Sequence, residues 1–239
     1  MDKLSRLNQM IKESKNIVFF GGAGVSTESG IKDFRSADGI YSMEYKFSPE
    51  EVLSHTFYEK HTEDFYDFYR QYLCFPDAKP NKAHYKLAEL EKVGKLKAVI
   101  TQNVDGLHQL AGSKKVFELH GSALRNYCIK CGKFYDFDYI YSSNGIPKCE
   151  CGGTVKPDVV LYEESLNDKV IHGAIKTITK ADMLIVAGTS LKVYPAAGFI
   201  RYFKGKNFVL INMEETGFDS EFGLVIYGRV GEILDIIKL

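Results

Sequence analysis

The feature that most constrains the fold is a set of short apolar runs that are continuous rather than alternating. Most are rich in Val and Ile. Four of the runs are clear: Ile17–Phe20, Ala98–Thr101, Met183–Ala187 and Phe208–Asn212. Two are weaker: Val116–Leu119 and Leu224–Tyr227. Such runs are typical of strands covered on both faces, as in a parallel sheet. Helical patterns lie between them at Asn81–Val93, Asp168–Lys180 and Pro195–Phe203. Strands that alternate with helices predict an α/β fold built on an open sheet with right-handed crossovers.

Two stretches interrupt this alternation. Lys32–Phe75 is helical in character and crowded with Phe and Tyr, whereas Ser122–Lys156 holds most of the cysteines and few long apolar runs. Both look like insertions that build a smaller domain beside the sheet, and a chain of 239 residues is long enough for that arrangement. We therefore expect a large domain from residues 1–31, 76–121 and 157–239. The small domain would combine a helical module, 32–75, with a cysteine-bearing module, 122–156.

Charge and hydropathy argue against a general nucleic-acid-binding protein, a secreted protein and a membrane protein. Lys plus Arg and Asp plus Glu both number 31, so the formal net charge is zero and gives no electrostatic reason to bind nucleic acids or membranes. Near the N-terminus, Leu4, Leu7 and Ile11 recur at helical spacing, where a signal peptide would have a continuous apolar run. We expect a cytoplasmic protein without a membrane span. The oligomeric state stays open, with a monomer plausible.

Four of the five cysteines form two close pairs. Cys128 and Cys131 are followed, after 17 intervening residues, by Cys149 and Cys151. Without a secretion signal, clustered cysteines indicate metal ligands rather than disulfides, and this spacing is typical of a zinc ribbon. Because all four ligands would be thiolates, no position is left for water, and the zinc is predicted to be structural. Cys74 is expected to be a core thiol.

A glycine-rich loop follows the first strand directly. Ile17–Phe20 leads into Gly21-Gly22-Ala23-Gly24, and a strand, a glycine turn and a helix start together form a phosphate cradle. Glycine lets backbone N–H groups approach a pyrophosphate, and the helix dipole favours its charge. The dehydrogenase fingerprint would require a third Gly where Thr27 stands. The loop predicts a dinucleotide site of another kind, with a tight turn lacking a ligand as the alternative.

Polar residues follow other predicted strands. Thr101–His108 comes after the second strand and His120 after the third. Side chains at the carboxyl ends of buried strands lie where ligands bind in open α/β sheets. Amides in such a place can pair with a carboxamide such as that of nicotinamide, and His120 is a candidate general base, although a lone histidine is more often structural. Gly188–Ser190 and Asn212 end two further strands and are candidates for phosphate or ribose contacts, with a helix N-cap as the alternative.

Taken together, these segments resemble the sirtuin family over nearly the whole chain. The resemblance rests on motifs that occur in family order: Gly22–Ser26 through Ser29–Arg35, Thr101–His108, Leu119–Gly121, the two cysteine pairs, Gly188–Leu191 through Pro195–Ala197, and Leu210–Asn212. Each motif is weak alone, but the ordered set is highly specific, and the length fits a compact bacterial or archaeal type. The resemblance implies a large Rossmann-like domain and a small domain with a zinc module and a helical module. NAD and an acyl-lysine peptide would enter the cleft between them.

The resemblance also implies roles for individual residues. His120 would be the catalytic general base. NAD would be contacted by Gly22, Ala23, Gly24, Thr27, Ile31, Asp33, Phe34, Arg35, Gln102, Asn103, Val104, Asp105, Gly188, Thr189, Ser190, Asn212, Met213, Glu214 and Val230. Within that set, Ala23, Ile31, Asn103 and Asp105 would surround nicotinamide. The acyl-lysine substrate would be contacted by Tyr66, Val159, Val160, Leu161 and Tyr162.

The implied activity is NAD-dependent deacetylation of protein lysines, which gives nicotinamide, O-acetyl-ADP-ribose and free lysine. The acyl oxygen would attack the sugar carbon that nicotinamide leaves, and His120 would deprotonate a ribose hydroxyl. One alternative is a mono-ADP-ribosyltransferase, in which a protein nucleophile traps the sugar. Another is a module that binds NAD without releasing nicotinamide. The presence of His120 favours deacylation, because that step requires a base.

The chain departs from the family pattern at a few positions. Lys32 replaces the proline that is usual before Asp33, and Tyr162-Glu163 stands where Phe-Gly is common. Some family members recognise acidic acyl groups with a Tyr and an Arg three residues later. Tyr66 fits this pattern, but Tyr69 occupies the arginine position. Arg70 follows, and one residue turns a helical side chain by about 100°. We therefore expect deacetylation over desuccinylation, with longer or acidic acyl groups as the alternative. The aromatics of Phe65–Phe68 would line the acyl channel or pack.

Overall fold

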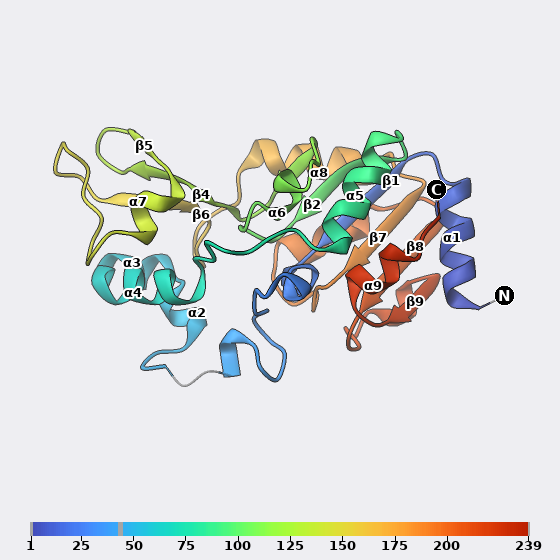
Figure 1. Cartoon of the computed structure of the whole chain (residues 1–239), viewed down its shortest axis with the longest axis horizontal. Coiled ribbons are helices and arrows are strands. Elements are labelled where there is room, and N and C mark those ends of the chain that lie inside the picture. The colour runs from blue at the N-terminus through green and yellow to red at the C-terminus, as the bar shows by residue number, and fades with distance from the viewer. Residues whose placement is uncertain (1, 43–44, 239) are drawn as a thin grey trace.

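A six-stranded parallel sheet organises the larger part of the molecule (Figure 1). The computed structural model describes residues 2–42 and 45–238. The strand order is β3-β2-β1-β7-β8-β9, and every neighbouring pair is parallel. The strands are β1 (Ile17–Gly21), β2 (Leu96–Thr101), β3 (Val116–Glu118), β7 (Met183–Ala187), β8 (Asn207–Asn212) and β9 (Leu224–Tyr227). Each overlaps one of the predicted runs, so the predicted open α/β sheet is confirmed.

Both faces of this sheet are covered, as the continuous apolar runs predict. Along β1, Ile17 and Phe19 enter the hydrophobic cluster on one face, while Val18 and Phe20 enter the cluster on the other. The first cluster includes residues of α1 (Lys3–Glu13), α5 (Lys82–Lys92) and α9 (Val230–Asp235). The second includes residues of α8 (Asp168–Thr179) and of the 3-10 helix η4 (Ala196–Tyr202). The sheet is therefore the middle layer of three.

A smaller unit lies at one end of the large sheet (Figure 1). It contains an antiparallel sheet in the order β5-β4-β6, four short helices, and a hydrophobic core separate from the two clusters around the large sheet. Its elements are α2 (Pro49–Val52), α3 (His55–Lys60), α4 (Thr62–Tyr72), β4 (Gly121–Cys128), β5 (Phe134–Tyr135), α7 (Phe137–Tyr141) and β6 (Val155–Val159). A helical part and a cysteine-bearing part thus share one core. β6 crosses the predicted boundary at 156/157, and the domain boundaries themselves stay predictions.

The remaining elements are short turns of helix. They are η1 (Ala23–Val25), η2 (Thr27–Ser29), η3 (Ile40–Ser42), α6 (Leu107–Leu110) and η5 (Asp219–Glu221). Across residues 2–42 and 45–238, no helix combines the length and apolar character needed to cross a membrane.

Lys95 fastens the end of α1 to the start of β2. Its Nζ donates to the carbonyls of Ile11, Lys12 and Ser14 at 3.0, 2.7 and 3.0 Å. We expect Lys95→Met to lower the free energy of unfolding by about 1–2 kcal/mol, because three helix-end carbonyls lose a charged donor. Urea denaturation measures this change. The matched control is Lys176→Met on the exposed side of α8, expected within about 0.5 kcal/mol of the native chain; an equal loss in both variants would contradict the assignment.

Candidate active site

The candidate residues lie together at the carboxyl ends of the strands of the large sheet, because parallel strands all end on the same side. Gly21, Thr101, Glu118, Ala187 and Asn212 each end a strand on that side. From β1 the chain proceeds to β2 on one side, while β7 lies on the other side of β1. A reversal of strand order of this kind opens a crevice at the carboxyl ends of the two central strands, where open α/β sheets bind ligands.

The loops after β1 and β7 lie in direct contact at this crevice. The N–H of Gly22 donates to the carbonyl of Ala187 at 3.2 Å, and that of Gly24 to the carbonyl of Gly188 at 2.9 Å. A Cβ at Gly22 would lie 2.8 Å from the Gly188 oxygen, and one at Gly24 would lie 2.8 Å from the Gly188 Cα. Gly188 has a φ of +58°. These glycines are therefore required by the contact between the loops, as well as by any ligand that approaches them.

The helix start predicted after the glycine loop is brief. The glycine loop continues into the two three-residue 3-10 turns η1 and η2, not into a long helix. Gly30 ends the second turn in the left-handed region with a φ of +82°. A single turn has little of the macrodipole that a full helix would supply, so an anion here would depend on individual N–H groups and side chains.

A buried hydroxyl links the glycine loop to the polar segment after β2. The Oγ of Ser26 accepts from Asn103 Nδ2 at 3.0 Å and donates to Asp105 Oδ2 at 2.7 Å, while Leu107 N donates to Asp105 Oδ1 at 2.9 Å. Burial raises the pKa of Asp105, and these hydrogen bonds oppose that shift. No role for Ser26 follows from the sequence pattern, because its partners lie 77 and 79 positions away. The network holds the two loops in one arrangement.

His120 is connected to the glycine loop through Gln102. Its Nδ1 lies 3.0 Å from the carbonyl of Gln102; because a carbonyl only accepts, Nδ1 carries the proton and Nε2 keeps its lone pair. The N–H of Gln102 donates to the Gly21 carbonyl at 2.9 Å, and its side-chain amide donates to Thr189 Oγ1 at 3.0 Å. Burial lowers the pKa of His120, partly opposed by the hydrogen bond to Gln102. The imidazole is therefore neutral at pH 7 and able to accept a proton.

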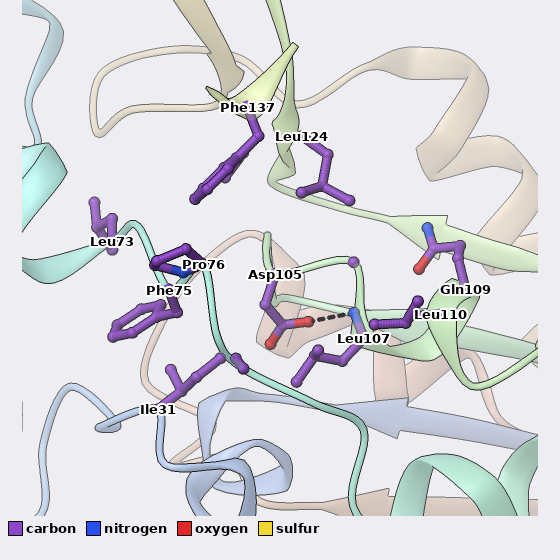
Figure 2. Close-up of a pocket in the computed structure, with 13 residues that line it drawn as sticks. Ile31, Leu73, Phe75, Pro76, Asp105, Leu107, Gln109, Leu110, Leu124 and Phe137 are labelled. Atoms are coloured by element: carbon purple, nitrogen blue, oxygen red, sulfur yellow. Dashed lines mark hydrogen bonds between the residues drawn. The ribbon is translucent and has the colours of Figure 1, made fainter. Parts of the chain in front are cut away.

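A mostly apolar pocket lies beside this network (Figure 2). Its volume is about 270 Å³. In Figure 2 the Asp105 carboxylate lies at its centre, with Ile31 on one side and Leu124 and Phe137 opposite. The lining comes from the loop after η2, the segment that precedes α5, the loop after β2, β4 and α7. Two of the four residues expected around nicotinamide, Ile31 and Asp105, thus share one pocket.

The four cysteines of the small unit converge on a single point. Their sulfur atoms all lie within 4.8 Å of one another, with Cys128 and Cys151 at 3.4 Å and Cys131 and Cys149 at 3.6 Å. Tetrahedral thiolates around zinc stand about 3.8 Å apart when each Zn–S bond is about 2.3 Å. A Cβ at Gly153 would come within 2.6 Å of the Cys128 sulfur, so this turn excludes any side chain. The donor set and its spacing fit one zinc ion.

Comparison with known proteins agrees with this geometry. The model of the Sir2 family matches residues 22–195. The chain belongs to the Sir2 family. It is 60% identical to an NAD-dependent protein deacetylase of Clostridium perfringens, over 98% of this chain and 97% of the relative. It is 59% identical to one of Clostridium acetobutylicum, over 99% and 98%. A Sir2 structure with a p53 peptide and NAD+ superposes with a TM-score of 0.85 at 39% identity, over 98% of this chain and 96% of that one.

Several residues expected to contact NAD in this sirtuin hold its loops in place. Asp33 Oδ1 accepts from the N–H of Arg35 at 3.0 Å and of Ser36 at 2.8 Å, so its carboxylate closes a turn. Asn212 Nδ2 donates to the carbonyl of Glu214 at 2.8 Å. The Val230 side chain is buried in the core, which leaves only its backbone for a ligand. These positions are compatible with NAD contacts, but the contacts themselves stay predictions.

The remaining expected NAD residues lie along the same sheet edge. Ala23, Phe34, Val104 and Ser190 are half-buried in the loops that follow β1, β2 and β7, whereas Thr27 and Met213 are exposed.

Two residues that the sequence analysis did not single out bind the glycine loop and its 3-10 turns to the starts of α5 and α9. Asn81, the N-cap of α5, donates from Nδ2 to the Val25 carbonyl at 2.8 Å and to Ser29 Oγ at 3.0 Å. Glu28 accepts from the N–H of Gly231 at 2.6 Å, at the start of α9. Asn81 precedes a helical pattern, so its capping role could have been predicted, but neither partner in the loop could.

The acyl contact expected of Tyr66 stays a prediction, and in this structure the residue packs inside the small unit. Its side chain is fully buried in the core of the small unit, and its hydroxyl donates to the Val155 carbonyl at 2.6 Å. Phe65 and Phe68 are buried in the same core, so these aromatics pack rather than line a channel. Arg70 donates from Nη1 to the carbonyl of Gly145 at 2.9 Å. It therefore points into the cysteine-bearing module.

The four other substrate residues form a continuous segment beside the catalytic candidate. The N–H of Val160 donates to the carbonyl of His120 at 3.0 Å. Leu161 is buried, whereas Tyr162 is exposed and its N–H donates to the carbonyl of Leu53 at 2.9 Å. Val159 ends β6, paired with Gly121. This segment of the sirtuin thus lies between the His120 backbone and the helical module, and its contact with a peptide stays a prediction.

The cysteine cluster lies at the opposite end of β4 from His120. The strand is eight residues long, so the zinc site is roughly 25 Å from His120 along it and takes no part in the chemistry. We expect the purified sirtuin to contain one zinc per chain, and Cys149→Ser to lose it and melt at a lower temperature. Metal analysis with thermal unfolding measures both. Cys74→Ser, which removes a thiol outside the cluster, is the control and should retain zinc; full zinc in Cys149→Ser would contradict the site.

Proposed function

We propose that this chain is an NAD-dependent protein-lysine deacetylase. The observation that carries the proposal is the continuous link from the His120 imidazole through Gln102 to the glycine loop and Thr189. This link sets a neutral base beside the crevice that the strand order predicts for a dinucleotide. The relatives named NAD-dependent protein deacetylase support it, as does a related Sir2 structure with deacetylated p53 peptide and 3′-O-acetyl ADP ribose.

NAD would lie across the carboxyl edge of the sheet. We assign its nicotinamide to the pocket beside Asp105 and Ile31, with the Asn103 amide as a partner for the carboxamide. The loops around Gly22–Gly24 and Gly188–Ser190 would hold the phosphates and the adjoining ribose. Arg35 lies on the loop after η2 with its guanidinium over the Tyr41 ring at 4.9 Å, and it would supply a cation to the phosphates. Asn212 and the Val230 backbone would hold the adenosine end.

NAD supplies the sugar carbon that receives the acyl oxygen when nicotinamide leaves. The protein contributes the base and the order of the site. His120 Nε2 would accept a proton from a ribose hydroxyl, and that hydroxyl oxygen would then bond to the acyl carbon. The Nδ1–H bond to Gln102 orients the ring and stabilises the imidazolium that forms. One water then adds to the acyl carbon as the bond from that carbon to the lysine nitrogen breaks, so the products are nicotinamide, O-acetyl-ADP-ribose and the free lysine amine.

The acyl-lysine peptide would lie along Val159–Tyr162, where the segment passes His120. We place the enzyme in the cytoplasm, because all five cysteines are free thiols and the zinc thiolates require a reducing compartment.

Replacement of the base separates the two halves of the reaction. In His120→Ala we expect deacetylation to fall by about 10²–10⁴-fold, while exchange of labelled nicotinamide into NAD falls less, because the base acts after the glycosidic bond breaks. Turnover of an acetyl-lysine peptide and label exchange measure the two steps on the same preparation. His172→Ala, on the exposed face of α8, is the matched control and should keep both activities. Equal, full deacetylation in His120→Ala would remove His120 from the mechanism.

The acyl preference follows from the placement of Tyr66 and Arg70. Because the first is buried and the second is bound to the cysteine-bearing module, neither is available to recognise a carboxylate on the acyl group. We expect faster turnover of an acetyl-lysine peptide than of the succinyl-lysine peptide of the same sequence, measured as kcat/KM. Arg70→Met should leave the ratio of the two kcat/KM values unchanged; faster desuccinylation by the native chain would contradict this preference.

A further inference from the structure

Two tyrosine hydroxyls join segments that are far apart in the sequence. Tyr41 in η3 and Tyr162 after β6 place their hydroxyl oxygens 2.9 Å apart, across 121 positions of sequence. Tyr162 occupies a position where the family commonly has phenylalanine, whose ring has no hydroxyl to form this hydrogen bond. Burial raises the pKa of Tyr41, which keeps its hydroxyl neutral and able to donate or accept. The bond therefore links two loops directly.

Tyr41 is fixed to the loop that carries the proposed phosphate contacts. Its N–H donates to the carbonyl of Phe34 at 2.9 Å, and the preceding Ile40 N–H donates to that of Asp33 at 2.8 Å. The guanidinium of Arg35 lies over the Tyr41 ring at 4.9 Å, and the ring of Phe34 meets it edge-on at 5.8 Å. A displacement of Phe34 or Arg35 on NAD binding therefore displaces Tyr41 as well.

Tyr162 is fixed to the proposed peptide segment. Its N–H donates to the Leu53 carbonyl at 2.9 Å, and its own carbonyl accepts from His55 N at 3.0 Å. The next residue, Glu163, has a φ of +75°, a conformation that residues with side chains rarely adopt. Its carboxylate accepts from the N–H of Thr56 at 2.8 Å, which holds the backbone in that conformation. The position of the Tyr162 hydroxyl is thus determined by the helical module and by the segment that a peptide would contact.

We propose that the Tyr41–Tyr162 hydroxyl pair couples NAD binding to acyl-peptide binding. A peptide that orders Val159–Tyr162 would hold the Tyr162 hydroxyl in place, and the bond to Tyr41 would favour the matching arrangement of residues 33–35. By thermodynamic linkage, NAD binding strengthens peptide binding by the same factor. Both tyrosines act here as positioning residues. This inference rests on the proposed function, since it requires both ligands to bind at these two segments.

The coupling is measured with a ligand pair that cannot react. The full-length protein is titrated with ADP-ribose alone and then with a saturating acetyl-lysine peptide, and the ratio of the two Kd values is the coupling factor. We expect the peptide to tighten ADP-ribose binding to the native chain. Tyr162→Phe and Tyr41→Phe should each reduce that factor by about 2- to 10-fold, the range for a single neutral hydrogen bond. The double variant should show no further loss, because both changes remove the same bond.

The control is Tyr85→Phe, which removes an exposed hydroxyl on α5 and should keep the native coupling factor. An unchanged factor in both single variants, or effects that add in the double variant, would overturn the coupling while leaving the proposed function intact. A native chain that binds neither ADP-ribose nor the acetyl-lysine peptide would overturn the proposed function and the coupling together. Thermal unfolding of each variant establishes that the comparison is between folded proteins.

Discussion

The contact between the loops after β1 and β7 is the constraint on which the rest of the site depends. Gly22 and Gly24 approach Gly188 so closely that a Cβ at any of the three would collide with backbone atoms of the facing loop. This contact lies at the crevice where the strand order reverses. The two loops touch through glycine backbone alone, so no side chain of these three residues occupies the crevice, and neighbouring polar side chains can face it. Ser26, Gln102 and Thr189 then connect the loops by hydrogen bonds.

His120 occupies the point where the two parts of the molecule join. The chain leaves β3 at Glu118 and enters β4 at Gly121, where a Cβ would collide with the carbonyl of Asp158 on β6. Arg125 binds Glu118 at 2.7 Å and Asp158 at 2.9 Å, which fastens both strands near this crossing. The position of His120 is therefore set by β3 of the large sheet on one side and by β4 of the small sheet on the other. Nucleotide and peptide would meet there, because one is bound by the large sheet and the other by β6 and the helical module.

Zinc binding and aromatic packing stabilise different modules of the small unit. In the cysteine-bearing module, four thiolates around one ion tie the two cysteine turns together, while Ile140 and Val155 pack into the core shared with the helical module. The helical module packs Tyr58, Phe65 and Tyr66 in edge-to-face contacts, and Tyr66 reaches across to the Val155 carbonyl. These two modules together support the segment Val159–Tyr162. The substrate segment is thus held by residues that take no part in the chemistry.

The parallel sheet, the zinc ligands, the general-base candidate and the family can all be predicted from the sequence, because each is encoded in contiguous residues or fixed spacings. Continuous apolar runs specify buried strands, and two cysteine pairs specify a tetrahedral site. The folded chain was needed to show that Tyr66 is buried, that short 3-10 turns follow the glycine loop, and that Ser26 and Tyr41 have partners 79 and 121 positions away. Such contacts are set by how whole elements pack, and a local pattern carries no record of which distant side chain will face it.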